Sequence, residues 1–243
     1  MDKAAYLDAV AADGAALTAA ARLGLDPQVP SCPDWTVADL VQHVGMVHAW
    51  VAEMVRTGAQ ERVSFRDLPK PPPPEGLADW FEAGVGTLVM VLRDADPDAT
   101  VWNWSPGPKV GSFWDRRMAQ ETTMHRWDGE SAHGVQQPIP AALAVDGIDE
   151  IIRVGLAADL VDNMEATLGG TLHLHTTDAE GEWLVEVTGG ELRVRDEHGK
   201  GDAAVRGPAS DLLLYLWGRQ PSVPMEVFGD QAVVDAWFRI IDL

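Results

Sequence analysis

The sequence is poor in the features of secreted and membrane-embedded proteins. Cys32 is the single cysteine among 243 residues, so no disulfide can form within the chain, which is typical of a reducing compartment. No apolar run approaches the roughly 20 residues needed to span a bilayer. The first residues also lack the basic start and apolar block of a secretion signal. We therefore expect a cytoplasmic protein that does not enter a membrane.

Basic residues are also scarce. Lys and Arg number 18 against 38 Asp and Glu, which gives a formal net charge of −20. A chain this acidic repels phosphate backbones and anionic lipid surfaces, so we expect no nucleic-acid and no membrane partner. A P-loop, a Rossmann glycine fingerprint and zinc-finger spacing are absent as well, which argues against nucleotide cofactors.

Helical periodicity dominates the first two thirds of the chain. Thr36 and Asp39 resemble a capping box, which predicts that a helix begins near them with Asp34 or Thr36 as its cap. The run of prolines at 71–74 excludes both helix and central strand and predicts a surface connector. The pattern predicts helices over residues 3–23, 77–94, 112–132 and 141–162, and one more from the cap at Asp34 or Thr36 to about residue 56.

The pattern changes to a period of two near residues 168–170. Three alternating runs separated by glycine-rich turns predict an antiparallel meander, and two short helical segments follow. The predicted strands are residues 171–175, 183–187 and 191–195, and the predicted helices are 209–217 and 231–241. Helices first and strands second indicate an α+β protein of two domains, which we place at residues 1–165 and 166–243.

Two short stretches carry most of the chemistry: D-L-V-Q-H-V-G at residues 39–45 and E-T-T-M-H-R-W-D at residues 121–128. Glu121 and His125 are four residues apart, so they share one helix face. With His43 from a second helix, they form a set of two imidazoles and one carboxylate. That set suits a divalent metal and leaves one coordination position open, as in catalytic zinc sites. Asp128 is placed to accept the second ring N–H of His125, as outer-shell residues usually do.

A simpler interpretation stays open for each residue. His43 lies in an apolar stripe, where a histidine is more often a hydrogen-bonded core residue, and Glu121 can be merely exposed. Two His and a carboxylate also suit other divalent ions, including non-haem iron. Trp50 and Trp114 lie seven residues from His43 and Glu121, so each either lines a pocket beside the site or fills the core.

Other histidines are weaker candidates. His48 is rotated by about 140° from His43 around the helix, so it cannot join the same site. His173 and His175 alternate on one predicted strand. They can in principle bind a metal, but the simpler interpretation places them on the solvent face of that strand.

Taken together, the motifs resemble a known family. W-T-V-A-D-L-V-Q-H-V at residues 35–44, E-x-x-x-H-x-x-D at 121–128 and the antiparallel C-terminal domain are similar to the maleylpyruvate isomerase family of mycothiol-dependent enzymes. These are actinobacterial proteins with a DinB-like four-helix bundle and a sterol-carrier-like second domain. The resemblance implies that His43, Glu121 and His125 are zinc ligands, with water or the thiol of mycothiol in the fourth position. It also implies that Arg219, in L-Y-L-W-G-R at residues 214–219, reaches toward the active site.

We therefore expect a zinc-dependent (or other divalent metal) transferase or isomerase. A metal-bound thiolate, from mycothiol by resemblance, would attack a small electrophilic substrate. Arg219 is expected either to hold a substrate carboxylate through paired hydrogen bonds or to cap the carbonyls that end its helix. Two alternatives stay open: a zinc-water hydrolase, and a non-catalytic protein that binds a small ligand and holds a structural metal. The substrate and the oligomeric state are not predicted.

Overall fold

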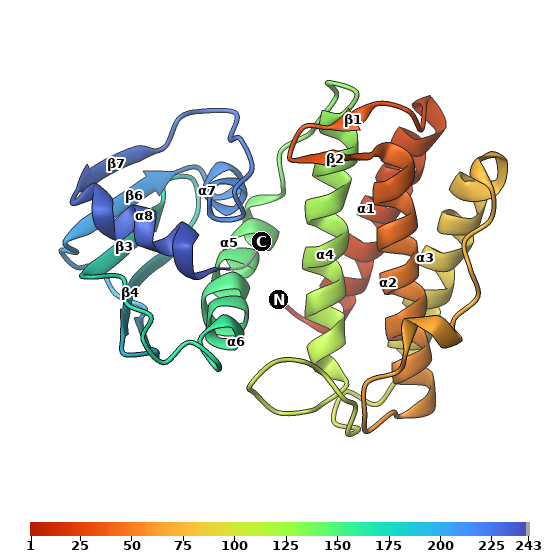
Figure 1. The fold of residues 1–243 in the computed structure, drawn as a ribbon, viewed down its shortest axis with the longest axis horizontal. Coiled ribbons are helices and arrows are strands. Elements are labelled where there is room, and N and C mark those ends of the chain that lie inside the picture. The colour runs from red at the N-terminus through yellow and green to blue at the C-terminus, as the bar shows by residue number, and fades with distance from the viewer. Residues whose placement is uncertain (242–243) are drawn as a thin grey trace. The chain divides into compact units, whose positions relative to one another are not determined.

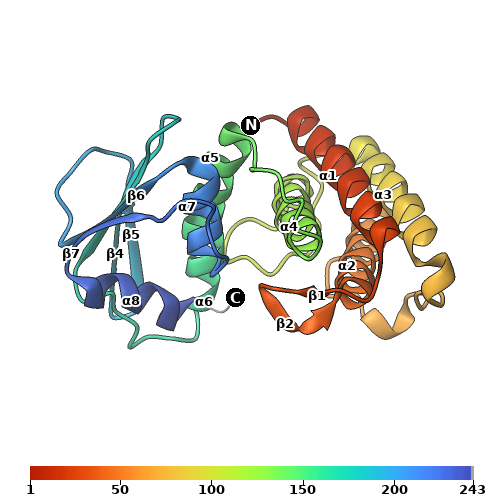
Figure 2. The ribbon, with the colours of Figure 1, turned by 90° about the horizontal axis from the view of Figure 1, so that it is seen from above.

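Four long helices build the N-terminal part of the computed structural model, which describes residues 1–241 (Figure 1). They are α1 (Lys3–Leu23), α2 (Val37–Thr57), α3 (Leu77–Asp94) and α4 (Ser112–Ser131). Figure 2 shows them side by side as a bundle. Their apolar stripes meet in one core, which includes Leu17, Leu40, Phe81, Leu88, Trp114 and Met118.

Local signals explain where these helices begin and end. Thr36 accepts a hydrogen bond from the backbone N–H of Asp39, while the Asp39 carboxylate accepts one from the backbone N–H of Thr36. This is the capping box that the sequence predicted. Helix α2 ends at Gly58, whose φ of 59° is a left-handed conformation that glycine adopts without steric cost.

The sequence did not predict the two-stranded hairpin that precedes α2. Strands β1 (Gln28–Val29) and β2 (Cys32–Thr36) pair antiparallel. They are short, and Pro33 interrupts the pattern that marks a strand. The hairpin matters because β2 runs directly into α2, close to His43. Between α2 and α3 the chain is irregular apart from two short 3-10 turns, η1 (Phe65–Asp67) and η2 (Pro74–Gly76).

Helix α4 is polar in sequence, yet it is buried along most of its length. It packs against α1 and α2. Gly129 permits the close approach to α1, because a Cβ there would lie 2.5 Å from Cδ1 of Leu17. Polar side chains on a buried helix must find partners, so this helix is where a functional site is expected.

A mixed sheet with helices forms the C-terminal part of the chain. Helix α5 (Ala141–Glu150) continues through a π-helical segment, η3 (Ile151–Leu156), into α6 (Ala157–Asp159). The sheet order is β5-β4-β3-β6-β7, and α7 (Ala209–Leu216) and α8 (Gln231–Ile240) pack against β6. The strands are β3 (Thr171–Thr176), β4 (Glu182–Thr188), β5 (Glu191–Arg195), β6 (Ala203–Gly207) and β7 (Glu226–Gly229).

The predicted antiparallel meander is present in β3, β4 and β5, but the sheet as a whole is mixed. Strand β6 pairs with β3 in parallel, and β7 pairs with β6 antiparallel. Neither β6 nor β7 was predicted, because both are short and stand apart from the alternating runs. The parallel pairing requires the connection after β5 to cross over β4 and β3 before the chain reaches β6.

The two-domain α+β class is confirmed, but the division between the parts differs from the expected boundary at residue 165. One compact unit comprises Met1–Asn103 and Lys109–Gln137, and the other comprises Trp104–Pro108 and the chain from Pro138 onward. Helix α5 packs against α7 and so belongs with the sheet. A change from helical to strand periodicity marks a change of element, and it does not show with which core a helix packs.

The length and apolar character of a helix decide whether it can cross a membrane. Within residues 1–241, no helix combines the length and the apolar character that crossing a bilayer requires.

Candidate metal centre

Helices α2 and α4 bring His43, Glu121 and His125 to one point. The Oε1 atom of Glu121 lies 3.5 Å from Nε2 of His43 and 3.5 Å from Nε2 of His125. One ligand atom from each of the three residues lies within 4.8 Å of the other two. Two ligands of a tetrahedral zinc ion are about 3.3 Å apart for bonds near 2.0 Å. The spacing of the three side chains therefore fits one divalent ion with little movement.

A hydrogen bond orients the ring of His125. Its Nδ1 atom lies 2.9 Å from Oδ2 of Asp128, and Asp128 is fully buried. The other oxygen of Asp128 accepts a hydrogen bond of 2.5 Å from the hydroxyl of Ser31. When Nδ1 donates its proton to Asp128, Nε2 is directed toward Glu121. This is the carboxylate–histidine arrangement that commonly supports a metal ligand, and it agrees with the role expected for Asp128.

Glu121 divides its two oxygens between different neighbours. While Oε1 faces the two imidazoles, Oε2 lies 3.4 Å from Nη2 of Arg117, one turn earlier on α4. Burial by itself would raise the pKa of Glu121. The neighbouring His125 and His43, together with Arg117, outweigh that effect and hold the pKa well below its usual range. Glu121 is therefore an anionic ligand group at neutral pH.

The same charges act on His125. Burial by itself would lower its pKa, but the carboxylates of Glu121 and Asp128 outweigh burial and raise the pKa to about 9. In the protein without metal, His125 thus carries a proton on each nitrogen at neutral pH. A metal ion must displace the proton on Nε2, so metal and proton compete for this position.

The cluster is open on the side of His43. The His43 side chain is 39% exposed, whereas that of His125 is 11% exposed. The ring of Trp35, from strand β2, lies 4.8 Å from the His43 ring and 6.4 Å from the His125 ring, measured between centroids. Trp35 therefore forms an aromatic wall beside the cluster. The sequence did not reveal this role of Trp35, because the hairpin that positions its ring was not predicted.

His48, which lies five residues after His43 on α2, is a buried core residue. Nε2 of His48 lies 2.9 Å from the hydroxyl of Thr122, and its ring stacks on Phe81. Because the Thr122 hydroxyl already donates to the backbone carbonyl of Met118, it accepts from His48. As expected, His48 is absent from the cluster among the residues that the structure describes.

The two tryptophans belong to an aromatic cluster of their own. Trp50 packs against Phe65, Trp102 and Trp114. The indole N–H groups of Trp50 and Trp114 donate to the backbone carbonyls of Val63 and Trp102. This arrangement favours core filling over a pocket beside the metal ligands.

Arg219 lies just after the end of α7. Its Nη1 atom donates a hydrogen bond of 2.9 Å to the backbone carbonyl of Trp217, and its guanidinium lies 5.9 Å from the centroid of the Trp217 ring. The backbone turns at Gly218, whose φ is 68°. The guanidinium thus makes the capping contact that was one of the two expectations, and the residue is half-buried.

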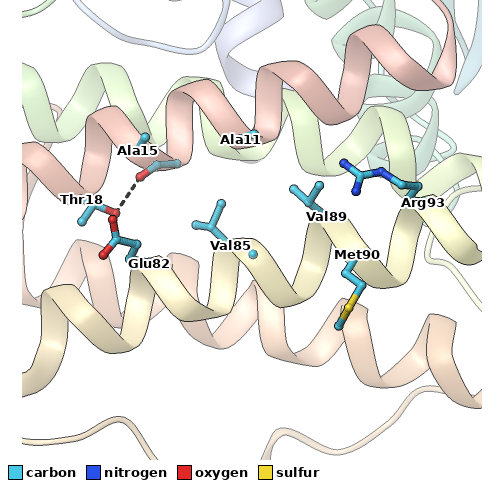
Figure 3. A pocket seen from close by; sticks show the side chains of 10 residues that line it. Ala11, Ala15, Thr18, Glu82, Val85, Val89, Met90 and Arg93 are labelled. Carbon is cyan, nitrogen blue, oxygen red and sulfur yellow. Dashed lines mark hydrogen bonds between the residues drawn. The ribbon is translucent and has the colours of Figure 1, made fainter.

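A groove on another side of the bundle is mostly apolar and lacks the candidate metal ligands. It lies between α1 and α3 with a volume of about 270 Å³, and Figure 3 shows Glu82 and Arg93 at opposite ends of it. Thr18 donates to the carbonyl of Gly14, and Glu82 forms an ion pair with Arg22. The apolar lining of the groove consists of Ala11, Ala15, Val85, Val89 and Met90. The groove contains none of the three candidate ligands and no comparable set of reactive groups among the described residues.

The fold and the cluster together define a class of protein: an α+β protein of two domains whose DinB-like bundle brings two imidazoles and a carboxylate together. A family model of the mycothiol maleylpyruvate isomerase N-terminal domain matches residues 4–129, and a model of the C-terminal domain of the same family (MDMPI) matches residues 142–236. The chain therefore belongs to the mycothiol maleylpyruvate isomerase family.

Solved structures share this fold. A mycothiol-dependent maleylpyruvate isomerase is 16% identical, with 93% of each chain covered and a TM-score of 0.60. A histidine-to-alanine mutant of mycothiol-dependent maleylpyruvate isomerase is 14% identical, with 88% of each chain covered and a TM-score of 0.56. At these identities the likeness establishes the fold. No curated protein matches the chain at a significant level.

Proposed function

We propose that this protein is a metal-dependent enzyme that uses mycothiol to isomerise or modify a small electrophilic substrate. The observation that supports the proposal is that Nε2 of His43 and Nε2 of His125 each lie 3.5 Å from Oε1 of Glu121, a spacing that suits the ligands of one ion. Membership of the mycothiol maleylpyruvate isomerase family supplies the thiol.

The donor set supports zinc or a similar divalent ion. Two neutral imidazoles and one carboxylate suit borderline transition metals better than magnesium or calcium, which prefer all-oxygen sites. A divalent ion held there would lower the pKa of a thiol in its open position, so that the thiol reacts as a thiolate near neutral pH.

The remaining residues have supporting roles in this proposal. Asp128 keeps the proton of His125 on Nδ1 and so leaves Nε2 to the metal. Arg117 holds the outer oxygen of Glu121, which fixes the rotamer of that ligand. The ring of Trp35 covers one side of the cluster and restricts the approach of water.

Arg219 is the proposed binding group for a substrate carboxylate. Its planar guanidinium can form two parallel hydrogen bonds to a carboxylate. Nη1 donates to the Trp217 carbonyl, which holds the guanidinium at the end of α7.

Hydrolysis by zinc-bound water is the less favoured alternative. Such a mechanism usually needs a carboxylate or imidazole free to act as general base beside the metal. Glu121 is assigned to the ion, and Asp128 is hydrogen-bonded to both His125 and Ser31. The arrangement therefore favours a thiol over an activated water as the nucleophile.

The test uses the full-length protein reconstituted with Co²⁺, which replaces zinc and absorbs visible light. Mycothiol is titrated into the sample, and the near-ultraviolet spectrum is followed. We expect a sulfur-to-cobalt charge-transfer band that saturates with mycothiol. S-methylated mycothiol is the matched control, because it keeps the scaffold but cannot supply a thiolate.

Activity is then measured against a panel of small electrophiles that includes maleylpyruvate, with and without mycothiol. Turnover that requires both the metal and mycothiol supports the proposal. A spectrum that does not respond to mycothiol, together with hydrolysis that needs no thiol, would refute it in favour of the hydrolase.

A further inference from the structure

A second cluster of histidines lies on the sheet of the C-terminal unit. His173 and His175 alternate along β3, and Glu182 begins the neighbouring strand β4. Glu182 is the cross-strand partner of His175 in the antiparallel register. Residues two apart on a strand share a face, and directly paired residues have Cβ atoms about 5 Å apart. The backbone pairing therefore brings the three side chains to one place.

The side chains converge on the Glu182 carboxylate. Oε1 of Glu182 lies 2.6 Å from Nδ1 of His175, and Oε2 lies 3.6 Å from Nε2 of His173. One ligand atom of each residue lies within 4.8 Å of the other two. Both ring nitrogens are shielded from solvent, and neither contact with the Glu182 carboxylate has the geometry of a hydrogen bond. Buried nitrogens are normally satisfied, so this pair suggests a missing ligand.

The expectation that His173 lies on a solvent face is wrong, because its side chain is buried, with 8% of the residue exposed. The helices cover the other face of the sheet, where the indole N–H of Trp183 donates to Asp149 of α5. The connection between β5 and β6 covers the histidine face. A Cβ at Gly199 would lie 2.5 Å from Leu184, and one at Gly201 would lie 3.0 Å from the backbone nitrogen of His173.

This connection also carries a third histidine to the cluster. Nδ1 of His198 lies 3.0 Å from Oε2 of Glu182, and the His198 ring packs edge-on against the His173 ring at 5.7 Å between centroids. Its side chain is 83% exposed. His198 therefore positions the carboxylate from outside while the two other imidazoles face it from the sheet.

We propose that Nε2 of His173, Nδ1 of His175 and the carboxylate of Glu182 bind one divalent transition-metal ion, separate from the ion proposed for the bundle. Two imidazoles and a carboxylate select a zinc-like ion over magnesium or calcium. Ligand atoms around zinc are about 3.3 Å apart, so the pair at 2.6 Å must open slightly. The half-buried side chains of His175 and Glu182 allow that movement.

The test is carried out on the full-length chain with His125→Ala, which removes a ligand of the bundle site. Co²⁺ and Zn²⁺ are titrated by calorimetry and absorption, with excess Mg²⁺ present. We expect the His125→Ala protein to bind one metal ion per chain. Adding Glu182→Gln or His175→Ala should abolish it, whereas Glu186→Gln should not. Glu186 is the matched control because it lies on the same face of β4 and pairs across the sheet with Thr171, away from the histidines.

A further variant, His198→Ala, should keep the stoichiometry at one and weaken affinity about ten-fold, because Glu182 loses the hydrogen bond that orients it. Circular dichroism checks that each variant is folded, and the half-exposed His175 is the variant least expected to disturb the sheet.

The proposal is overturned if the His125→Ala protein binds no metal. It is also overturned if the bound metal ion is retained after both Glu182→Gln and His175→Ala, or if Glu186→Gln removes that ion as well. Loss of the bundle site is judged separately, by comparing the wild-type stoichiometry with that of His125→Ala. The two metal sites can therefore fail independently.

Discussion

The hydrogen bond from His125 to Asp128 offers a direct test of the proposed bundle site, because Asp128 supports a proposed ligand without being one itself. One of its oxygens accepts from Nδ1 of His125 and the other from the hydroxyl of Ser31. Asp128→Asn keeps the shape and one acceptor oxygen but removes the negative charge. Asp128→Ala removes both acceptors and leaves Nδ1–H of His125 buried without a partner.

The expected losses follow from these contacts. Mutation of a residue that supports a metal-bound histidine typically costs 10- to 100-fold in affinity. Because asparagine can still accept one hydrogen bond, Asp128→Asn is expected at the lower end, near ten-fold or about 1.4 kcal/mol. Asp128→Ala is expected near 100-fold or about 2.7 kcal/mol. Ser31→Ala, which removes only the contact to Oδ1, should lie below both.

Zinc affinity is measured at a fixed pH by competition with a chromophoric chelator. Asp13→Asn is the matched control, since Asp13 is also largely buried and also accepts hydrogen bonds from α4, there from Thr123 and Arg126. It faces away from the cluster, so it should lower stability without changing zinc affinity. Equal zinc affinity in wild type, Asp128→Asn and Asp128→Ala, all folded, would refute the role of Asp128 and weaken the case for a metal on His125.

Other predictions address the ligands, the substrate and the pH dependence. His125→Ala should lose most of the metal bound at the bundle site, and unchanged zinc content by elemental analysis there would contradict the ligand assignment. Arg219→Lys should retain metal yet lose turnover of a carboxylate substrate, because an ammonium cannot form the paired hydrogen bonds; unchanged kinetics would reduce Arg219 to a helix cap. Burial lowers the pKa of His48 from 6.5 to about 4, so the folded state favours its neutral form and its contribution to stability is complete above pH 6.5. As pH falls from 6.5 to 4, the free energy of unfolding of the wild type should fall by about 3 kcal/mol relative to that of His48→Gln, at about 1.36 kcal/mol per pKa unit. Urea denaturation measures the two free energies of unfolding at each pH. If both change equally with pH, the predicted contribution of His48 is wrong.

Periodicity and capping were sufficient to predict most of the bundle. The bounds of α1 and α3 were predicted correctly, and α2 is capped by Thr36, one of its two predicted caps, because helical signals lie within a few residues of each other. Strands β6 and β7 were missed because a short strand is defined by the neighbour with which it pairs, and that neighbour is distant in sequence.

The site shows the same limit. The spacing of Glu121 and His125 followed from one helical turn, and Arg117, four residues before Glu121, was equally readable as an i,i+4 pair although it was overlooked. The contribution of Trp35 depends on a hairpin that sequence patterns did not reveal. The cluster around Glu182 depends on strand register and on the path of the connection that carries His198.

By itself, the sequence determined the class of the protein, the long helices and the set of candidate metal ligands, because these follow from local spacing and residue chemistry. Only the tertiary structure decided that His43 meets Glu121 and His125, and that His173 is buried beside Glu182. Helix packing and strand pairing create those contacts between distant segments, and no short-range pattern in the chain encodes the distance between two side chains on different elements.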